Sequence, residues 1–184
     1  MSTRVKILRT SVLLADKAPG GHRVTVADAS GFRAGDLIYL SDDRREVDIN
    51  PARVFRNLVN MEILTCVAVE DNDLVFEAPT RRQYLSAFGA RATRIAPVRR
   101  SHIRLGRMTW AGLQPNRNFH AVQVDYGAQC TVAVGMIDGR GGRIAQGIRL
   151  SNSHDCHAIG GLIEGAAGSG SGEGYGATLY YSTA

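Results

Sequence analysis

Short runs in which apolar and polar residues alternate occupy the second half of the chain, and they recur at a regular interval. Residues 121–139 match residues 147–165 without a gap when they are moved forward by 26 positions. The offset aligns chemically similar residues along the whole segment, including Cys130 with Cys156. A fixed period of this length, made of strand-like runs and closed by glycine, is typical of the coils of a solenoid.

The repeat extends in both directions from this pair of segments. Upstream, residues 103–112 match residues 130–139 at an offset of 27. Downstream, residues 176–182 match residues 147–153 at an offset of 29. Turns of variable length between fixed strands explain this drift. The runs are too short, and too rich in Val, Ile, Thr and Gly, for helical repeats.

These repeats predict a parallel β-helix over residues 101–184, with about three incomplete coils stacked at the spacing of neighbouring strands, roughly 4.8 Å. The last run ends inside a coil, so we expect the β-helix to be open at its C-terminus. Solenoids normally cap such an end. The chain is therefore expected to be a piece of a longer protein, or to be covered there by another subunit.

The first half of the chain has a different pattern, in which short alternating runs are separated by polar turns. It predicts an N-terminal arm over residues 1–21, a small β-barrel-like or sandwich domain over residues 22–84, and a connector over residues 85–100. The charged stretch 42–46 is interpreted as a solvated loop. The strands expected in the domain include residues 24–26, 37–40, 61–69 and 74–77, with Gly35 and Asp36 closing the first turn.

Both halves resemble known proteins. Residues 99–184 resemble the single-stranded right-handed β-helix of the pectate-lyase-like superfamily. Residues 22–84 resemble the small β-domain that precedes such coils in bacteriophage tailspikes of the polysaccharide-depolymerase type. The second likeness rests on Val24–Leu40, Glu62–Val69, Asp73–Pro79 and Tyr84. The resemblance implies an all-β architecture, but no single activity, because the superfamily includes lyases, hydrolases, epimerases and inert adhesins.

The net charge of the chain indicates what kind of partner it binds. The chain has a net charge of +5, and eight arginines fall between Arg81 and Arg107. This charge favours an anionic partner such as an acidic polysaccharide. The alternative is a solvated basic surface at the junction of the two halves. No nucleic-acid-binding motif accompanies the arginines, so nucleic acid is not an expected partner.

The sequence also bears on location. It shows no secretory signal and no apolar stretch of the ~20 residues that a membrane span requires. We therefore expect a virion or extracellular location that is reached without a signal peptide.

Three cysteines without a CxxC spacing argue against a zinc site and a disulfide framework, and neither a metal nor a cofactor is expected. Cys130 and Cys156 occupy equivalent positions in adjacent coils. Their expected separation permits a disulfide, but a stacked pair of buried thiols is the favoured interpretation.

One pair of carboxylates could carry catalysis. Asp138 and Glu164 occupy equivalent positions on neighbouring coils, and each follows an isoleucine that is expected to point inward. Two outward carboxylates could approach the ~5–5.5 Å separation of a retaining glycosidase, or lie farther apart as in an inverting one. The alternative is that both lie in water beside glycine turns.

A second constellation is formed by His154, Asp155 and His157. The adjacent His154 and Asp155 could supply a general base and its orienting partner. Neighbours in an extended segment point to opposite faces, which weakens their cooperation. Calcium-dependent lyases of the superfamily use clustered aspartates and a basic residue. Here Asp125 is the only acid expected to face outward on its strand, and Arg149 is the nearest base, so the lyase pattern is not matched.

The expected outer face of the coils also carries polar and aromatic residues that could contact sugar. Trp110, aligned with Ile137, is interpreted either as a core residue or cap of the first coil, or as a platform for sugar stacking. The candidate ligand-binding residues are Trp110, Asp125, Tyr126, Arg149 and Tyr180.

The leading hypothesis is a tailspike-like virion or surface module that recognises bacterial polysaccharide, as a homotrimer or together with other virion subunits. One alternative is an enzyme proper, a glycoside hydrolase or polysaccharide lyase that uses the outward carboxylates. The other is a catalytically inert module that serves assembly.

Overall fold

The computed structural model describes residues 6–45, 59–112, 120–142, 146–166 and 175–180. The chain divides into two compact units, Met1–Pro97 and Val98–Ala184. The described residues form strands and one short 3₁₀ helix, η1 (Ser86–Phe88), with no α-helix among them. The predicted all-β fold class is confirmed.

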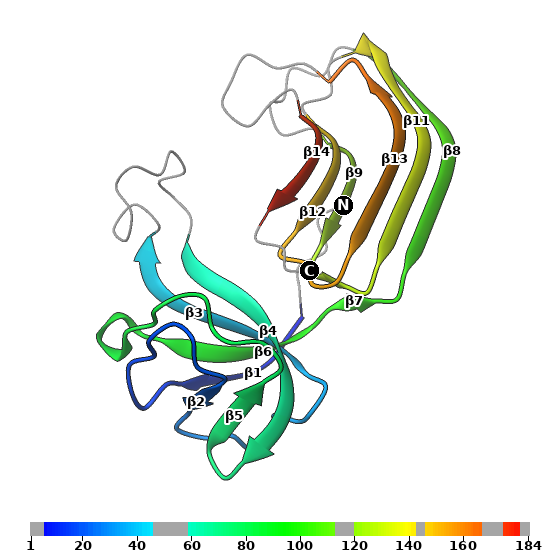
Figure 1. The fold of residues 1–184 in the computed structure, drawn as a ribbon. Coiled ribbons are helices and arrows are strands. Elements are labelled where there is room, and N and C mark those ends of the chain that lie inside the picture. Colours follow the sequence, from blue (N-terminus) through cyan, green and yellow to red (C-terminus); the bar gives the residue numbers. More distant parts are fainter. Residues whose placement is uncertain (1–5, 46–58, 113–119, 143–145, 167–174, 181–184) are drawn as a thin grey trace. The chain divides into compact units, whose positions relative to one another are not determined.

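Six antiparallel strands form one sheet in the first unit, in the order β1-β6-β3-β4-β5-β2. Leu13 and Val26, which directly follow the two outer strands, form a bridge, and the N–H of Leu14 donates to the carbonyl of Thr25 at 3.0 Å. The sheet therefore closes on itself as a small barrel (Figure 1). Its strands are β1 (Lys6–Val12), β2 (Arg23–Thr25), β3 (Leu37–Arg45), β4 (Val59–Glu70), β5 (Asp73–Phe76) and β6 (Arg91–Ala96).

Two segments that the sequence placed outside the domain supply strands of this barrel. β1 lies in the predicted arm and β6 in the predicted connector, and β6 pairs with both β1 and β3. Those two assignments are therefore wrong. The buried side chains of these strands include the small or polar residues Ser11, Ala92 and Thr93. Small and polar residues do not produce the alternation of apolar and polar positions by which a strand is predicted, even though the backbones of these strands pair.

The stretch 42–46 is also not a solvated loop in its described part, because β3 continues to Arg45. Asp42 is fully buried, and Arg44 forms an ion pair with it at 2.7 Å. A charged residue can enter the interior here because an opposite charge two positions along the strand accompanies it.

Residues 81–85 form a strap that is fastened to the barrel by buried carboxylates. Asp42 of β3 and Glu62 of β4 accept hydrogen bonds from this strap. The N–H of Leu85 donates to Asp42 at 3.1 Å, the N–H of Arg81 donates to Glu62 at 3.0 Å, and the hydroxyl of Tyr84 donates to Glu62 at 2.9 Å. Burial, reinforced by the Glu62 carboxylate, raises the pKa of Tyr84, so its hydroxyl keeps the proton that it donates.

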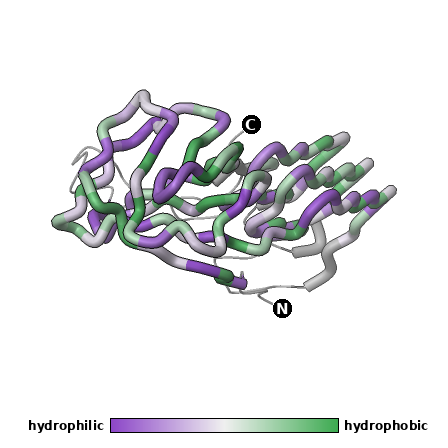
Figure 2. Tube along the Cα trace, turned by 90° about the horizontal axis from the view of Figure 1, so that it is seen from below, coloured by the Kyte–Doolittle hydropathy of each residue, from purple (hydrophilic) through white to green (hydrophobic). Residues whose placement is uncertain are grey.

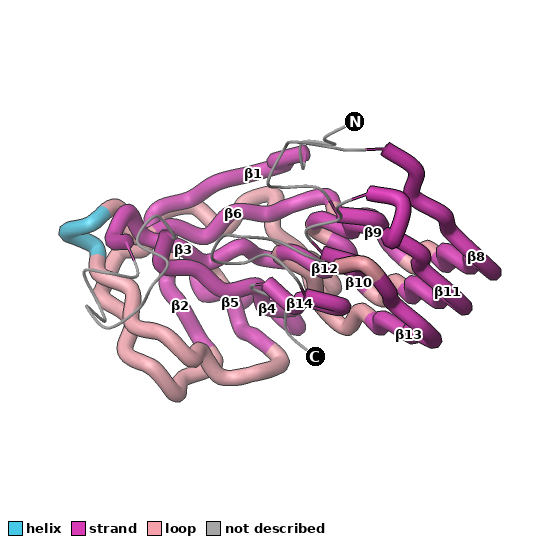
Figure 3. Tube along the Cα trace, turned by 90° about the horizontal axis from the view of Figure 1, so that it is seen from above, coloured by secondary structure: helices cyan, strands magenta, loops and turns pink. Residues whose placement is uncertain are grey.

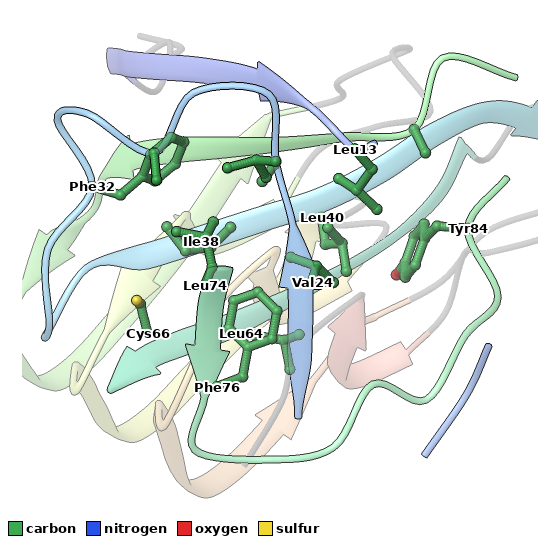
Figure 4. Packing of buried hydrophobic residues seen from close by; sticks show 14 residues of the cluster. Leu13, Val24, Phe32, Ile38, Leu40, Leu64, Cys66, Leu74, Phe76 and Tyr84 are labelled. Carbon is green, nitrogen blue, oxygen red and sulfur yellow. The ribbon is translucent and has the colours of Figure 1, made fainter. Parts of the chain in front are cut away.

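The interior of the barrel is apolar, and Figure 4 shows its side chains converging from several strands and from the strap. The cluster comprises Leu13, Val24, Val26, Ala29, Phe32, Ile38, Leu40, Leu64, Cys66, Leu74, Phe76, Tyr84, Ala90 and Ala92. The turn before β3 is built as predicted, since Gly35 has a positive φ of 86° and Asp36 accepts the N–H of Arg33 at 2.7 Å.

The second unit is a parallel β-helix of three stacked coils. Figure 3 shows β8, β11 and β13 side by side, and β9, β12 and β14 form a second three-stranded sheet. The first coil contains β7 (Val98–Arg99), β8 (His102–Gly112) and β9 (His120–Asp125); the second contains β10 (Gly127–Ala128), β11 (Thr131–Gly142) and β12 (Gln146–Ser151); the third contains β13 (His157–Glu164) and β14 (Tyr175–Tyr180).

The register confirms two of the three predicted offsets. Val132 lies opposite Ala158, at the offset of 26, and Ile148 lies opposite Ala177, at the offset of 29. The upstream offset of 27 is wrong, because Val132 lies opposite Ile103, 29 positions earlier. Side chains alternate with a period of two, so a slip of two residues leaves the same residues facing inward.

The interior of the coils is formed by aliphatic side chains from both sheets, and Figure 2 shows hydrophobic and hydrophilic positions interleaved along the strands. The most buried members are Val122, Val124, Val132, Val134, Ile137, Ile148 and Leu150. Cys130 and Cys156 are free thiols, stacked so that the N–H of Cys130 donates to Cys156 Sγ at 3.3 Å.

Candidate functional site

A hydrogen-bonded cluster of polar side chains lies on β9 and β12. In register, Gln123 is opposite Arg149, and Asp125 is opposite Ser151. Arg149 Nη1 lies 2.8 Å from His120 Nε2, and Arg149 Nε donates to Ser151 Oγ at 2.7 Å. Gln123 Nε2 donates to Asp125 Oδ2 at 2.5 Å. These five residues are called the β9–β12 cluster below.

The sequence predicted two members of this cluster, Asp125 and Arg149, as ligand-binding residues. Gln123, Ser151 and His120 were not among those candidates. His120 is the first residue of β9 and precedes the alternating run in which Asp125 was identified. The repeat could have identified His120, because the offset of 26 aligns it with Gln146, another polar residue.

The electrostatics of the cluster favour a neutral imidazole. Burial lowers the pKa of His120, the Arg149 guanidinium lowers it further, and Asp125 acts in the opposite direction. Arg149 donates to Nε2, so the proton of the neutral ring lies on Nδ1. That Nδ1 atom is buried and has no hydrogen-bond partner within the part of the chain that the structure describes. The cluster thus presents an oriented guanidinium on β12 and a carboxylate on the neighbouring strand β9. These donors and acceptors suit a hydroxyl-rich ligand.

Asp138 and Glu164 lie opposite each other on β11 and β13, as the repeat predicted. Asp138 does not lie in water, however, because its side chain is only 9% exposed and pairs with Arg107 of β8 at 3.0 Å. The sequence missed Arg107, since the wrong offset of 27 placed it beside Val134, whereas it lies opposite Met136. The two carboxylates therefore differ: Glu164 is half-buried, and Asp138 is buried beside a cation.

His154 and Asp155 lie at a corner of the third coil. The N–H of His154 donates to the carbonyl of Gly127 at 2.9 Å, and Asp155 has a left-handed backbone, with φ of 48°. The carboxylate of Asp155 lies 3.6 Å from His157 Nε2, and both side chains are exposed. Asp155 therefore contacts the histidine two positions along, consistent with side chains that alternate between faces.

Three other candidates, Tyr126, Trp110 and Tyr180, lie on the coils outside the β9–β12 cluster. Tyr126 also occupies a left-handed corner, with φ of 53°; burial raises the pKa of its phenol, and Asp125 adds to the effect. Trp110 follows Thr109 at a register irregularity of β8, and Met108 rather than Trp110 lies opposite Ile137. Tyr180 pairs with Ser151 in the sheet. The side chains of Trp110 and Tyr180 lie outside the described part of the chain.

A column of glycines crosses the β8–β11–β13 sheet. A Cβ atom on Gly135 would lie 2.5 Å from the carbonyl oxygen of Gly106, and one on Gly161 would lie 2.2 Å from that of Gly135. Real Cβ atoms do not approach backbone oxygen so closely, so these two positions require glycine. A Cβ on Gly106 would meet nothing within 4 Å.

No protein-family model matches the chain, and no curated protein matches it. Solved structures of phage tailspikes do. The tailspike gp61 of Pseudomonas phage phi297 aligns with 85% of this chain at 14% identity and a TM-score of 0.58. The tailspike gp54 of Acinetobacter baumannii bacteriophage AP22, solved in complex with A. baumannii capsular saccharide, aligns with 85% at 15% identity and a TM-score of 0.56. The tailspike gp49 of Pseudomonas phage LKA1 aligns with 84% at 18% identity and a TM-score of 0.52.

The chain thus has a tailspike-like fold, and it spans about a third of the length of these tailspikes: 31%, 31% and 29%. The described residues include no helix long and apolar enough to cross a membrane. Nor do they include a group of three or more His, Cys, Asp or Glu residues arranged to hold a metal ion.

Proposed function

We propose that this chain is a virion module of the tailspike type that recognises a bacterial surface polysaccharide through the β9–β12 cluster. The observation that carries the proposal is the arrangement of Arg149, His120 and Asp125 on a fold shared with a tailspike that was solved with capsular saccharide. The guanidinium is oriented by two neighbours before any ligand arrives. Such preorganisation lowers the entropic cost of binding.

Hydrogen bonding to sugar hydroxyls explains the residue types in the cluster. Arg149 offers donors only, Asp125 offers acceptors only, and the Gln123 amide offers both. Adjacent hydroxyls of a pyranose present the complementary pattern. Hydrogen bonds to a charged side chain contribute about 1.5–3 kcal/mol each.

The test is binding of the 184-residue chain to a panel of purified bacterial capsular polysaccharides, A. baumannii capsule included, measured by biolayer interferometry. Arg149→Gln should weaken binding of any captured polysaccharide by at least about tenfold, the loss of one charge-assisted hydrogen bond. Arg33→Gln removes one positive charge from an exposed position in the barrel and serves as the matched control. Unchanged binding by a folded Arg149→Gln protein would contradict the proposed role of the cluster.

A second function, glycoside hydrolysis, is favoured by one observation. Asp138 and Glu164 are register neighbours in different environments, one ion-paired with Arg107 and one half-buried. Pairs of carboxylates in unlike environments can divide the roles of acid and base. Glu164→Gln should then abolish release of reducing ends from a bound polysaccharide, while Glu77→Gln, an exposed barrel carboxylate, should not. If wild-type protein releases no reducing ends from any polysaccharide that it binds, this second function is rejected.

We further propose that the module works within an assembly, as a homotrimer or with other virion subunits. Multi-angle light scattering of the purified chain gives its mass directly. A monomer at micromolar concentration would rule out a homotrimer formed by this chain alone.

A further inference from the structure

A groove of about 320 Å³ lies on the β8–β11–β13 sheet, which is a different sheet from that of the β9–β12 cluster. Its lining includes Arg104, Gly106, Ala133, Gly135 and Ile159. The volume falls at the lower end of the ~300–1,000 Å³ that is typical of small-molecule sites.

The register of the coils explains the shape of this groove. Arg104, Ala133 and Ile159 lie opposite one another on the three strands and form one row of side chains. Beside this row, Gly106 and Gly135 contribute no side chains. Because Gly135 cannot accept a Cβ atom without striking the backbone of the preceding coil, the hollow is a fixed feature of the strand stacking.

The groove is cationic at one end and apolar at the other. Arg107, on the same strand as Arg104, is paired with Asp138. Arg104 is exposed, and within the described ranges it has no ion-pair or hydrogen-bond partner. At the β13 end, the groove is lined by Ile159, which is 58% exposed.

We propose that this groove is a subsite for an acidic sugar, whose carboxylate pairs with Arg104 while an apolar face of its ring packs on Ala133 and Ile159. The inference rests on the proposed polysaccharide recognition and adds its chemical class. Arg and carboxylate form bidentate, charge-assisted hydrogen bonds. The carbon-bound hydrogens of a pyranose supply apolar surface for the other end.

The charge of Arg104 argues against the other occupants of such a groove. A second copy that covered this groove with apolar surface would bury the guanidinium without a partner, and burial of an unpaired charge is costly. A neutral glycan would leave Arg104 with no opposite charge. The net charge of +5 acts in the same direction as the local one, since it attracts polyanions at long range.

The test uses three acidic oligosaccharide series, oligogalacturonate, hyaluronan fragments and oligosialic acid, each with its carboxyl-reduced derivative, and titrates each into the full chain by isothermal calorimetry. At least one acidic series should bind, and its reduced derivative should bind at least about tenfold more weakly, the loss of a charge-assisted pair. Arg104→Gln should have the same effect. Gly106→Val should also block binding, because its side chain extends into open space in the groove without striking the backbone. Arg33→Gln should change the affinity less than twofold.

Each other outcome overturns the inference. The inference is overturned if none of the three acidic series binds, or if the acidic and carboxyl-reduced forms bind equally. Acid binding that survives both Arg104→Gln and Gly106→Val places the subsite elsewhere. If Arg149→Gln then abolishes polysaccharide binding while these two variants do not, the proposed function stands and the groove subsite fails. An oligomer that Gly106→Val dissociates would show that a second copy occupies the groove.

Discussion

The buried carboxylates of the barrel and the β9–β12 cluster of the coils use charge in different ways. In the barrel, the carboxylates of Asp42 and Glu62 are buried and bind the strap 81–85. In the coils, Asp125 and Arg149 lie on neighbouring strands, in contact with partly exposed neighbours. The barrel must fasten irregular backbone, whereas the coils satisfy much of their backbone by stacking strand on strand. Solenoid side chains are therefore free to form a binding surface.

The largest expected effect tests the structural use of charge in the barrel. Asp42→Ala should lower the free energy of unfolding by about 3–5 kcal/mol, because the largely buried Arg44 loses its partner. Asp43→Ala removes the neighbouring carboxylate, whose side chain is 65% exposed and pairs with Arg91. That change should cost less than about 1 kcal/mol. Urea denaturation measures both, and equal losses would show that Asp42 is not a structural carboxylate.

An intermediate effect tests the regular stacking of the coils. Gly135→Ala places a methyl group 2.5 Å from the Gly106 carbonyl oxygen and should destabilise the protein by about 1–3 kcal/mol, as overpacking does. Gly106→Ala meets no atom within 4 Å and should alter stability by less than about 1 kcal/mol. Thermal denaturation compares the two variants. A stable Gly135→Ala protein would mean that the coils can move apart at this column.

The smallest expected effect is a pH dependence of the coils. The pKa of His120 lies below its ordinary value, chiefly through burial, so the unfolded chain takes up this proton at a higher pH than the folded chain. The neutral ring therefore contributes full stability above the unfolded pKa, about 6.5, and this contribution is lost as the pH falls through the folded pKa.

Melting temperatures between about pH 5 and pH 8 reveal this dependence, because the window contains the ordinary titration of histidine. His120→Gln should flatten the acid side of the profile. His157→Gln, which replaces an exposed histidine of the same unit, is the control. If both variants keep the wild-type profile, the acid sensitivity arises elsewhere and His120 is not held neutral by the cluster.

Sequence patterns predicted the coils better than the barrel. The pairing of Asp138 with Glu164 and the stacking of Cys130 on Cys156 both follow from the offset of 26, because parallel in-register strands repeat the same chemical pattern. In the barrel, β1 and β6 pair through strands whose buried residues include Ser11, Ala92 and Thr93. Residues of this kind provide little hydrophobic signal.

Only some residues of the candidate sites were predicted from the sequence. Asp125 and Arg149 were identified because each stands out as a charge within an alternating run, and the register places their strands side by side. Arg107 and His120 were missed. Arg107 lies opposite Met136 at the true offset of 29, and its side chain reaches Asp138 two positions further along β11. His120 enters its cluster through a side-chain contact that spans 29 positions.

The sequence by itself determined that the chain is all-β and that its second half is a stack of parallel coils. These properties follow from the two-residue alternation of strands and from the repeat. The tertiary structure alone decided the exact neighbour of each strand in the barrel and the absolute register of the first coil. A change of strand register by two residues leaves the alternation of side chains unchanged. Only the packed structure therefore shows which charged residues lie in contact.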